Sequence, residues 1–159
     1  MRNNIYVDFG YLVVLAATFG AVMTLGVLVA PVVFNPNALL VDVALDRYNS
    51  GMLMSEIFAR FSTWLYIVAT LVVIYEAMWY KRGQRDAISF ASAFIVVATS
   101  LLFSAVYVPK ILSMQALGAE ATMSDTFANI HTASELDFKI LAVSLIVLFI
   151  RRLMLLRRA

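Results

Sequence analysis

The stretch FGYLVVLAATFGAVMTLGVLVAPVVF, residues 9–34, contains no charged side chain. An α-helix needs roughly 20 consecutive apolar residues to cross a hydrocarbon core about 30 Å thick, and this stretch is longer. It also exceeds the apolar core of a cleavable signal peptide, which has about 7–15 residues. We therefore expect a retained helix that spans a membrane.

The remainder of the chain is also strongly apolar. Of its 159 residues, 63% are hydrophobic and 14% are charged, whereas soluble domains contain about 45–50% apolar residues. Three further apolar segments predict spans, so that the four are about 9–34, 57–80, 87–110 and 126–152 within a single membrane domain, 1–159. The predicted fold is all-α, an integral membrane four-helix bundle.

The positions of Lys and Arg predict the orientation of this bundle, because cytoplasmic loops are enriched in both. One side of the predicted topology holds Arg2, Lys81, Arg82, Arg85, Arg151, Arg152, Arg157 and Arg158. The other side holds Arg47, Arg60, Lys110 and Lys139. Both termini are therefore expected in the cytoplasm (N-in/C-in). Basic residues at these boundaries indicate contact with the lipid bilayer and not with nucleic acid.

The first predicted outer loop has a helical pattern of its own. From Asn37 to Tyr48 the apolar residues recur at helical spacing, with charged residues on the opposite face. This pattern predicts a helix lying flat on the outer membrane interface. The tripeptide Asn49-Ser50-Gly51 is expected to end it.

Two pairs of short motifs indicate an internal repeat. VAPVVF at 29–34 resembles YVPKIL at 107–112, and each ends a predicted span with a proline. IFARFSTW at 57–64 resembles TFANIHTA at 126–133, and each opens the span that follows. Two hairpins of the same orientation would form a parallel repeat about an axis along the membrane normal.

The fourth predicted span opens with a stripe of ionisable side chains. His131, Glu135 and Lys139 follow at four-residue steps and so lie along one face of a helix. Placing a lysine in the hydrocarbon costs about 2.5–3.5 kcal/mol, so we expect Lys139 to face the bundle interior with Glu135 as its partner. Glu56 and Arg60 form a similar pair at the start of the second span. If these two spans are neighbours, the five side chains form one polar cluster in the outer third of the bundle.

Three interpretations of this cluster stay open. Paired charges could tie the helices together. His131 and Glu135 could chelate a metal ion with Glu56 as a third ligand, although the cations Arg60 and Lys139 would oppose a bound cation. Intramembrane ionisable groups also mark transport or proton pathways.

Copper and haem are the cofactors to consider. Four methionines lie on the predicted outer side, namely Met52, Met54, Met114 and Met123, and thioethers suit Cu(I), although methionine also fills apolar cores. The single histidine, His131, allows a haem only with methionine or another axial ligand, or in a dimer. The chain has no cysteine, which excludes disulfides, thiolate ligands and cysteine nucleophiles.

Other residues are expected to serve packing. Two stripes of small side chains would let helices approach closely: Ala16, Gly20 and Thr24, and Ala91, Ala98 and Ala105. Near the predicted cytoplasmic boundary, Glu76 is within reach of Lys81 or Arg82. The sequence contains no phosphate-binding loop, nucleophile elbow or zinc-protease motif, so we expect no enzyme activity.

Three motifs, GVLVAPVVF, SEIFARFSTW and TFANIHTASELDF, resemble those of the small four-span bacterial proteins of domain-of-unknown-function family 4149. Eukaryotic members of that family are called transmembrane-protein-205-like. The resemblance implies a four-span fold without a settled activity, and it marks His131 as a candidate functional residue and Arg60 as a second. The layout is more distantly similar to CopD-like copper-resistance proteins and to four-span protoporphyrinogen oxidases. Those families carry several intramembrane histidines, where this chain has one.

The leading functional hypothesis is a small inner-membrane protein that handles or transports a small solute or ion through the outward-facing cluster. The alternative is a non-catalytic accessory or assembly subunit, in a homo-oligomer or a larger membrane complex, or else a copper- or haem-binding membrane protein. Neutral replacement of Lys139 or Glu135 should abolish transport under the first hypothesis. Under the assembly hypothesis it should reduce stability or assembly, and Gly20→Leu should matter more.

Overall fold

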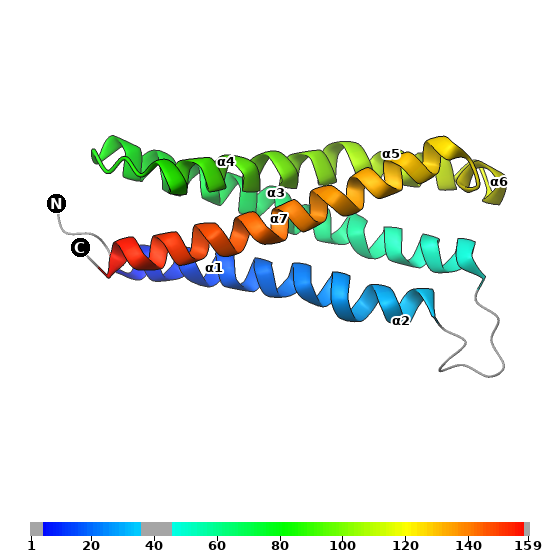
Figure 1. Cartoon of the computed structure of the whole chain (residues 1–159), viewed down its shortest axis with the longest axis horizontal. Helices are drawn as coiled ribbons and strands as arrows, with labels where there is room; N and C mark the ends of the chain where they lie inside the picture. The colour runs from blue at the N-terminus through cyan, green and yellow to red at the C-terminus, as the bar shows by residue number, and fades with distance from the viewer. Residues whose placement is uncertain (1–4, 36–45, 158–159) are drawn as a thin grey trace.

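The computed structural model describes residues 5–35 and 46–157. Within this part the chain is helical, with no strand. The elements are α1 (Ile5–Met23), the π-helix η1 (Thr24–Val29), α2 (Ala30–Phe34), α3 (Arg47–Lys81), α4 (Ala87–Leu102), the π-helix η3 (Phe103–Tyr107), α5 (Val108–Gln115), α6 (Ala119–Thr122) and α7 (Asp125–Leu156). They form four long helical rods that lie side by side, and the described chain starts and ends at the same end of the bundle (Figure 1). The all-α prediction is confirmed.

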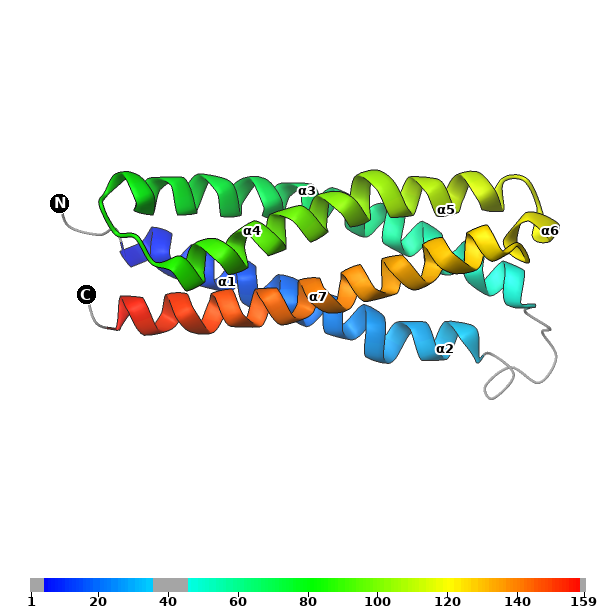
Figure 2. The ribbon, with the colours of Figure 1, turned by 45° about the horizontal axis from the view of Figure 1, so that its top comes forward.

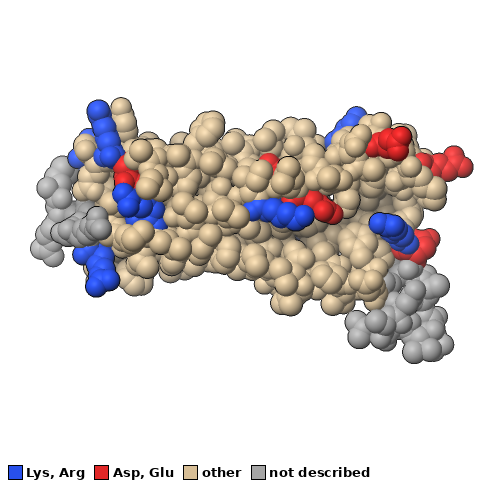
Figure 3. All heavy atoms as spheres, in the orientation of Figure 1, with Lys and Arg blue, Asp and Glu red and all other residues tan. Residues whose placement is uncertain are grey.

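Three of the four rods have the length and composition of membrane spans: Ile5–Phe34, Arg47–Lys81 and Ala87–Gln115. The fourth rod, α7, is 32 residues long but carries Glu135, Asp137 and Lys139 near its middle as well as charges at both ends, and it is not among the three. The outer surface is apolar, with Phe94 74% exposed and Val143 62% exposed, and Figure 3 shows broad uncharged areas on the face drawn. Monomeric soluble proteins rarely expose such continuous apolar surface, so the bundle suits a lipid bilayer. A fourth crossing by α7 stays a prediction.

Side-chain caps set where the long helices begin. Asp46, Asp86 and Ser124 precede α3, α4 and α7, and each accepts a hydrogen bond from the backbone N–H three residues further on, at 2.7, 2.9 and 3.2 Å. Such caps satisfy a backbone donor that the helix leaves free. At the other end of α3, Gly83 adopts φ of 80°, the left-handed conformation that ends many helices.

The prediction that Asn49-Ser50-Gly51 ends a helix is wrong, because these residues lie within the first turns of α3. The cap from Asp46 starts the helix before them, and Gly51 leaves room for a neighbour. A Cβ atom at Gly51 would lie 3.3 Å from Gln115 Nε2. The rest of the predicted interfacial helix, residues 37–45, falls outside the described residues.

Both repeated proline motifs have the same local structure. Pro31 and Pro109 each lie at the start of a short α-helix, directly after η1 or η3. A proline in a helix removes one N–H donor and clashes with the carbonyl four residues earlier. Those carbonyls belong to Val27 and Ala105, which lie inside the two π-helices, where the wider turn changes the hydrogen-bond pattern.

The rods pack in the order α1, α7, α4, α3 around the bundle. The closest packing joins α4 to α7, α1 to α7, and α3 to α4, while α1 and α2 also contact α3, and Figure 2 shows α7 running beside α4. Helices α3 and α7 therefore face each other across the core and meet through large side chains. Phe138 of α7 contacts Phe58 and Phe61 of α3 at ring-centroid distances of 5.4 and 6.3 Å.

Candidate functional site

The predicted ionisable stripe forms along one face of α7. His131 Nε2 lies 3.2 Å from Glu135 Oε1, and Lys139 Nζ lies 3.7 Å from Glu135 Oε2. The His131 ring also stacks on Phe127, with ring centroids 6.0 Å apart. Glu135 is thus the shared partner of two basic side chains, as the four-residue spacing predicts.

The prediction that Lys139 faces the bundle interior is wrong. Its side chain is 74% exposed, and those of Glu135 and His131 are 53% and 45% exposed. The inward face of α7 is occupied by Phe138 and Leu141, which are buried. Because each residue turns about 100° from the one before, Lys139 and its partners lie on the outer surface of the single chain.

Glu56 and Arg60 form a second surface pair on α3, with Glu56 Oε1 2.8 Å from Arg60 Nε. Their side chains are 58% and 81% exposed. The ion pairs of these residues each lie within one helix, so in the described part of the chain no ion pair joins Glu56 and Arg60 to His131, Glu135 and Lys139. That the five side chains act as one cluster stays a prediction.

The metal interpretation finds no support in this geometry. Among the described residues, no group of three or more His, Asp or Glu side chains lies close enough to hold a metal ion. The predicted third ligand, Glu56, is bonded to Arg60. The Met-Leu-Met motif does not present two thioethers to one ion, because Met54 is buried and Met52 is 40% exposed.

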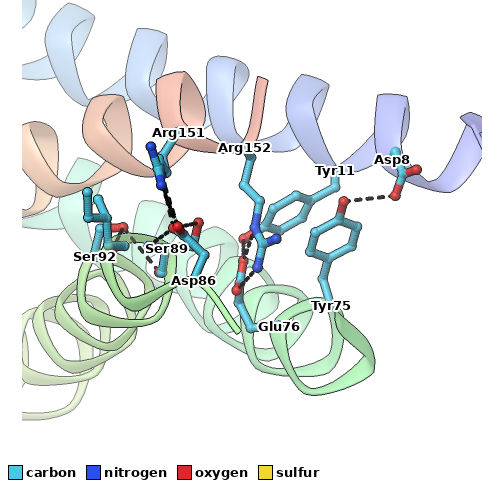
Figure 4. Close-up of polar contacts among 10 residues, drawn as sticks. Asp8, Tyr11, Tyr75, Glu76, Asp86, Ser89, Ser92, Arg151 and Arg152 are labelled. Carbon is cyan, nitrogen blue, oxygen red and sulfur yellow. Dashed lines mark hydrogen bonds and ion pairs between the residues drawn. The ribbon is translucent and has the colours of Figure 1, made fainter. Parts of the chain in front are cut away.

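A buried polar network lies at the opposite end of the bundle, near the basic loops (Figure 4). Arg152 of α7 and Glu76 of α3 form a two-point ion pair, in which Arg152 Nε donates to Glu76 Oε1 at 2.8 Å and Arg152 Nη2 donates to Glu76 Oε2. Arg152 is 1% exposed and Glu76 is 5% exposed. Tyr11 of α1 also donates to Glu76 Oε1, at 3.2 Å. Sequence reasoning indicated Lys81 or Arg82 as the partner of Glu76, whereas the structure pairs it with Arg152.

Aromatic rings enclose this ion pair and extend the network. The Arg152 guanidinium lies over the rings of Trp79 and Tyr75, with Cζ 4.6 and 5.5 Å from their centroids. Tyr75 stacks on Tyr11 at a centroid distance of 3.7 Å and donates a 2.8 Å hydrogen bond to the buried Asp8. Cation–π contact and two-point pairing compensate the buried guanidinium, and together they join α1, α3 and α7.

Sequence reasoning missed the Asp8, Tyr11 and Tyr75 members of this network. These three residues lie on two different helices, so no repeated spacing in the sequence connects them. The available signal was the presence of two acids, Asp8 and Glu76, at the same predicted boundary of two otherwise uncharged spans.

A second ion pair joins α4 to α7 beside the network. Arg151 Nε donates to Asp86 Oδ2 at 3.0 Å, and Nη2 donates to Asp86 Oδ1 at 2.5 Å. The same carboxylate accepts from the N–H and the hydroxyl of Ser89, both at 2.9 Å. The Arg151 guanidinium, with these Ser89 donors, holds the pKa of the Asp86 carboxyl well below its usual range.

One further carboxyl is buried within α7. Asp137 is 6% exposed, and its Oδ2 atom is buried without a hydrogen-bond partner in the described part of the chain. The hydroxyl oxygens of Ser100 and Ser104 are buried and unpartnered within the same described ranges. Buried polar atoms are usually hydrogen-bonded, so each exception points to strain or a ligand.

Comparison with known proteins identifies a family. No curated protein and no solved structure matches the chain. The family model described as "Domain of unknown function (DUF4149)" matches residues 13–120, which is more than half of the sequence. The matched region contains most of the first rod, the whole of the second and third rods and both proline motifs. Of the buried network it contains Tyr75, Glu76 and Trp79. The chain therefore belongs to the DUF4149 family.

Proposed function

We propose that the protein is a non-catalytic subunit of the bacterial inner membrane, with four spans and both termini in the cytoplasm, that assembles with a second copy of itself. The face used is the assembly stripe, defined as His131, Glu135 and Lys139. One observation carries the proposal: Lys139 is exposed on the outer surface of the bundle at a depth where lipid would otherwise surround it. The proposal develops the assembly alternative raised by the sequence, but it places the contact at the charged stripe and not at the stripes of small residues.

The depth of Lys139 follows from helix geometry. Twelve residues separate it from Arg151 at the basic end, which is about 18 Å at 1.5 Å per residue, within a hydrocarbon core about 30 Å thick. Its exposed neighbours are apolar, with Leu136 59% and Val143 62% exposed. Exposing a lysine to lipid at this depth costs about 2.5–3.5 kcal/mol. Contact with another protein surface avoids that cost, so we expect such a surface to cover Lys139.

The charges of the assembly stripe favour a second copy of the chain as the protein that covers Lys139. Two copies related by an axis along the membrane normal present their stripes at equal heights. Glu135 of each copy would then lie one helical turn, about 6 Å, from the level of Lys139 of the other. The long lysine side chain can reach that carboxylate diagonally across the contact, so that both charges gain a second partner. Transport through this stripe has less support, because the stripe lies on the outer surface and does not line an interior.

The absence of cysteine allows a direct test. We expect Val143→Cys, one turn below Lys139, to form disulfide-linked dimers in membranes under oxidation. Phe94→Cys, which is 74% exposed on α4, is the matched control and should remain monomeric.

Charge reversal tests the pairing itself. In the Val143→Cys background, Lys139→Glu should reduce the cross-linked fraction at least severalfold, and adding Glu135→Lys should restore it. A cross-link to a different protein would contradict the second copy as partner. Equal cross-linking at residues 94 and 143, or none at either, would contradict assembly through the stripe.

A further inference from the structure

We infer that Asp137, Ser100 and Ser104 form a binding site for one monovalent cation, a sodium ion or a proton, inside the bundle between α7 and the α4–η3 rod. This site is separate from the assembly stripe, which lies on the outer face of α7. Three observations carry the inference: the isolation of the Asp137 carboxyl, its position relative to the two serines, and the unpartnered state of all three side chains.

Asp137 is remote from compensating charge. α1 with α2 carries no charge from 9 to 34, and α4 with η3 carries none from 87 to 107. On α3, Arg60 and Glu56 lie near the level of Asp137, but they pair with each other and their side chains are 81% and 58% exposed. The ionisable groups nearest to it along α7 are Glu135 and Lys139, and these lie on the exposed face. An intramembrane carboxyl in such surroundings marks a functional site by default.

Two contacts fix the height of Asp137 against the neighbouring rod. α7 runs antiparallel to α4 and η3. At one end of this pair of rods Asp86 binds Arg151, and further along Phe103 contacts Phe138 at a ring-centroid distance of 4.9 Å. Asp137 directly precedes Phe138, and Ser104 directly follows Phe103. Ser104 is therefore level with Asp137, and Ser100 lies one turn, about 6 Å, further toward Asp86.

Helical periodicity places these side chains on facing sides. Asp137 lies two heptads before Arg151, and a helix drifts only about 20° per heptad, so Asp137 lies close to the side of α7 that meets Asp86. Ser104 lies eighteen residues after Asp86, which is five helical turns. Ser100 and Ser104 therefore lie on the side of their rod that meets Arg151, toward α7.

The two hydroxyls are available to a ligand. Serine and threonine within a helix usually donate to a carbonyl three or four residues earlier, as Ser92 does to Ile88 and Thr99 to Ile95, both at 2.7 Å. Ser100 Oγ and Ser104 Oγ have no such partner in the part of the chain that the structure describes. Ser104 lies in η3, and π-helical turns are frequent at functional sites.

The donor chemistry selects the ligand. One carboxylate and two hydroxyl oxygens are hard donors, which suit alkali and alkaline-earth cations rather than copper or zinc. A single carboxylate balances one positive charge, so a monovalent ion leaves the buried site neutral. A proton achieves the same neutrality by converting Asp137 into a donor to one of the serines.

The first test is thermal unfolding of the full chain in detergent, with sodium replaced by choline at constant ionic strength. If the ion is sodium, Tm should rise by about 3–6 °C for each tenfold increase of sodium above the dissociation constant. Asp137→Asn and Ser100→Ala/Ser104→Ala should reduce or remove this dependence. Glu120→Gln, an exposed carboxyl change outside the site, should retain it.

The second test separates the proton from sodium. If the ion is a proton, choline and sodium should give equal Tm values, and infrared spectra near neutral pH should contain the carbonyl stretch of a protonated carboxyl group. That band should be missing in Asp137→Asn and present in Glu120→Gln. Absence of both a sodium response and the band would overturn the inference, and the dimer cross-linking of Val143→Cys reports separately on assembly.

Discussion

At the scale of single residues, Arg152 and Trp79 are among the largest side chains that the bundle buries completely. A buried guanidinium is tolerated because Glu76 pairs with it at two points and two aromatic rings cover its faces. Such a pair contributes little net stability over an apolar replacement of both partners, yet removing one partner leaves an uncompensated charge. The network thus fixes how α1, α3 and α7 meet more than it adds to stability.

Replacing one member of this pair tests that argument. Arg152→Met should lower the free energy of unfolding by about 3–5 kcal/mol, because Glu76 would remain buried without its cation. The matched change in the exposed pair, Arg60→Met, should lower it by about 0–1 kcal/mol. Equilibrium unfolding in mixed detergent micelles measures both.

The double variant Arg152→Met/Glu76→Leu is the control for the mechanism. It should be more stable than Arg152→Met alone, because no buried charge remains without a partner. A double variant as unstable as the single one would show that packing, and not uncompensated charge, accounts for the loss.

At the scale of elements, the interface between α4 and α7 combines close packing with an ion pair between Asp86 and Arg151 at one end. Small or short side chains, including Ser89 and Ser144, are buried along these two helices and permit close approach of the backbones. Asp86 both caps α4 and binds Arg151, so one carboxylate fixes where α4 begins and where α7 lies beside it.

The lowered pKa of Asp86 predicts that the stabilising effect of this ion pair depends on pH. The folded carboxyl has a pKa below its unfolded value, near 3.9, so its stabilising contribution is complete above about pH 5 and is lost as the pH falls through the folded pKa. Thermal unfolding of the wild type between pH 2 and 6 should show this loss as a falling Tm.

Asp86→Asn removes the ionisable group and is the direct comparison. Its Tm should be lower than that of the wild type at pH 6, and the difference should shrink toward low pH. Asp125→Asn, which replaces an exposed acid outside this ion pair, should follow the wild-type curve. A constant difference between wild type and Asp86→Asn would contradict the assignment.

At the scale of the whole molecule, the two hairpins share features that support the predicted parallel repeat. Asp8 lies 23 residues before Pro31, and Asp86 lies 23 residues before Pro109. Each aspartate bonds to the second long helix of its own hairpin, through Tyr75 or Arg151. Each proline also follows a π-helix. The packing order α1, α7, α4, α3 places equivalent helices on opposite sides of the bundle, as a two-fold axis along it requires.

Single-cysteine labelling tests the predicted topology of this molecule. In the cysteine-free chain, Met123→Cys at the α6–α7 turn should react with a membrane-impermeant maleimide in intact cells. Gln84→Cys and Arg157→Cys, at the opposite end of the bundle, should react only after the membrane is permeabilised. Labelling of residues 123 and 157 from the same side would contradict a fourth crossing by α7, and the reverse pattern would contradict the orientation.

The sequence by itself determined the helical, membrane-suited character of the chain, the approximate extent of each rod and the stripe of His131, Glu135 and Lys139. These features depend on local quantities: the length of apolar runs, capping side chains and four-residue spacing. The resemblance to the DUF4149 family was likewise confirmed, by a match over residues 13–120 that includes two of the three motifs.

Only the tertiary structure decided which side of each helix is buried. A helix that is apolar nearly all round shows no preferred face in its sequence, so the inward positions of Asp137 and Arg152 and the outward position of Lys139 could not be predicted from spacing. Likewise, Arg152 finds Glu76 across 76 residues of chain, because the packing order of the rods, and not distance along the sequence, sets which side chains meet.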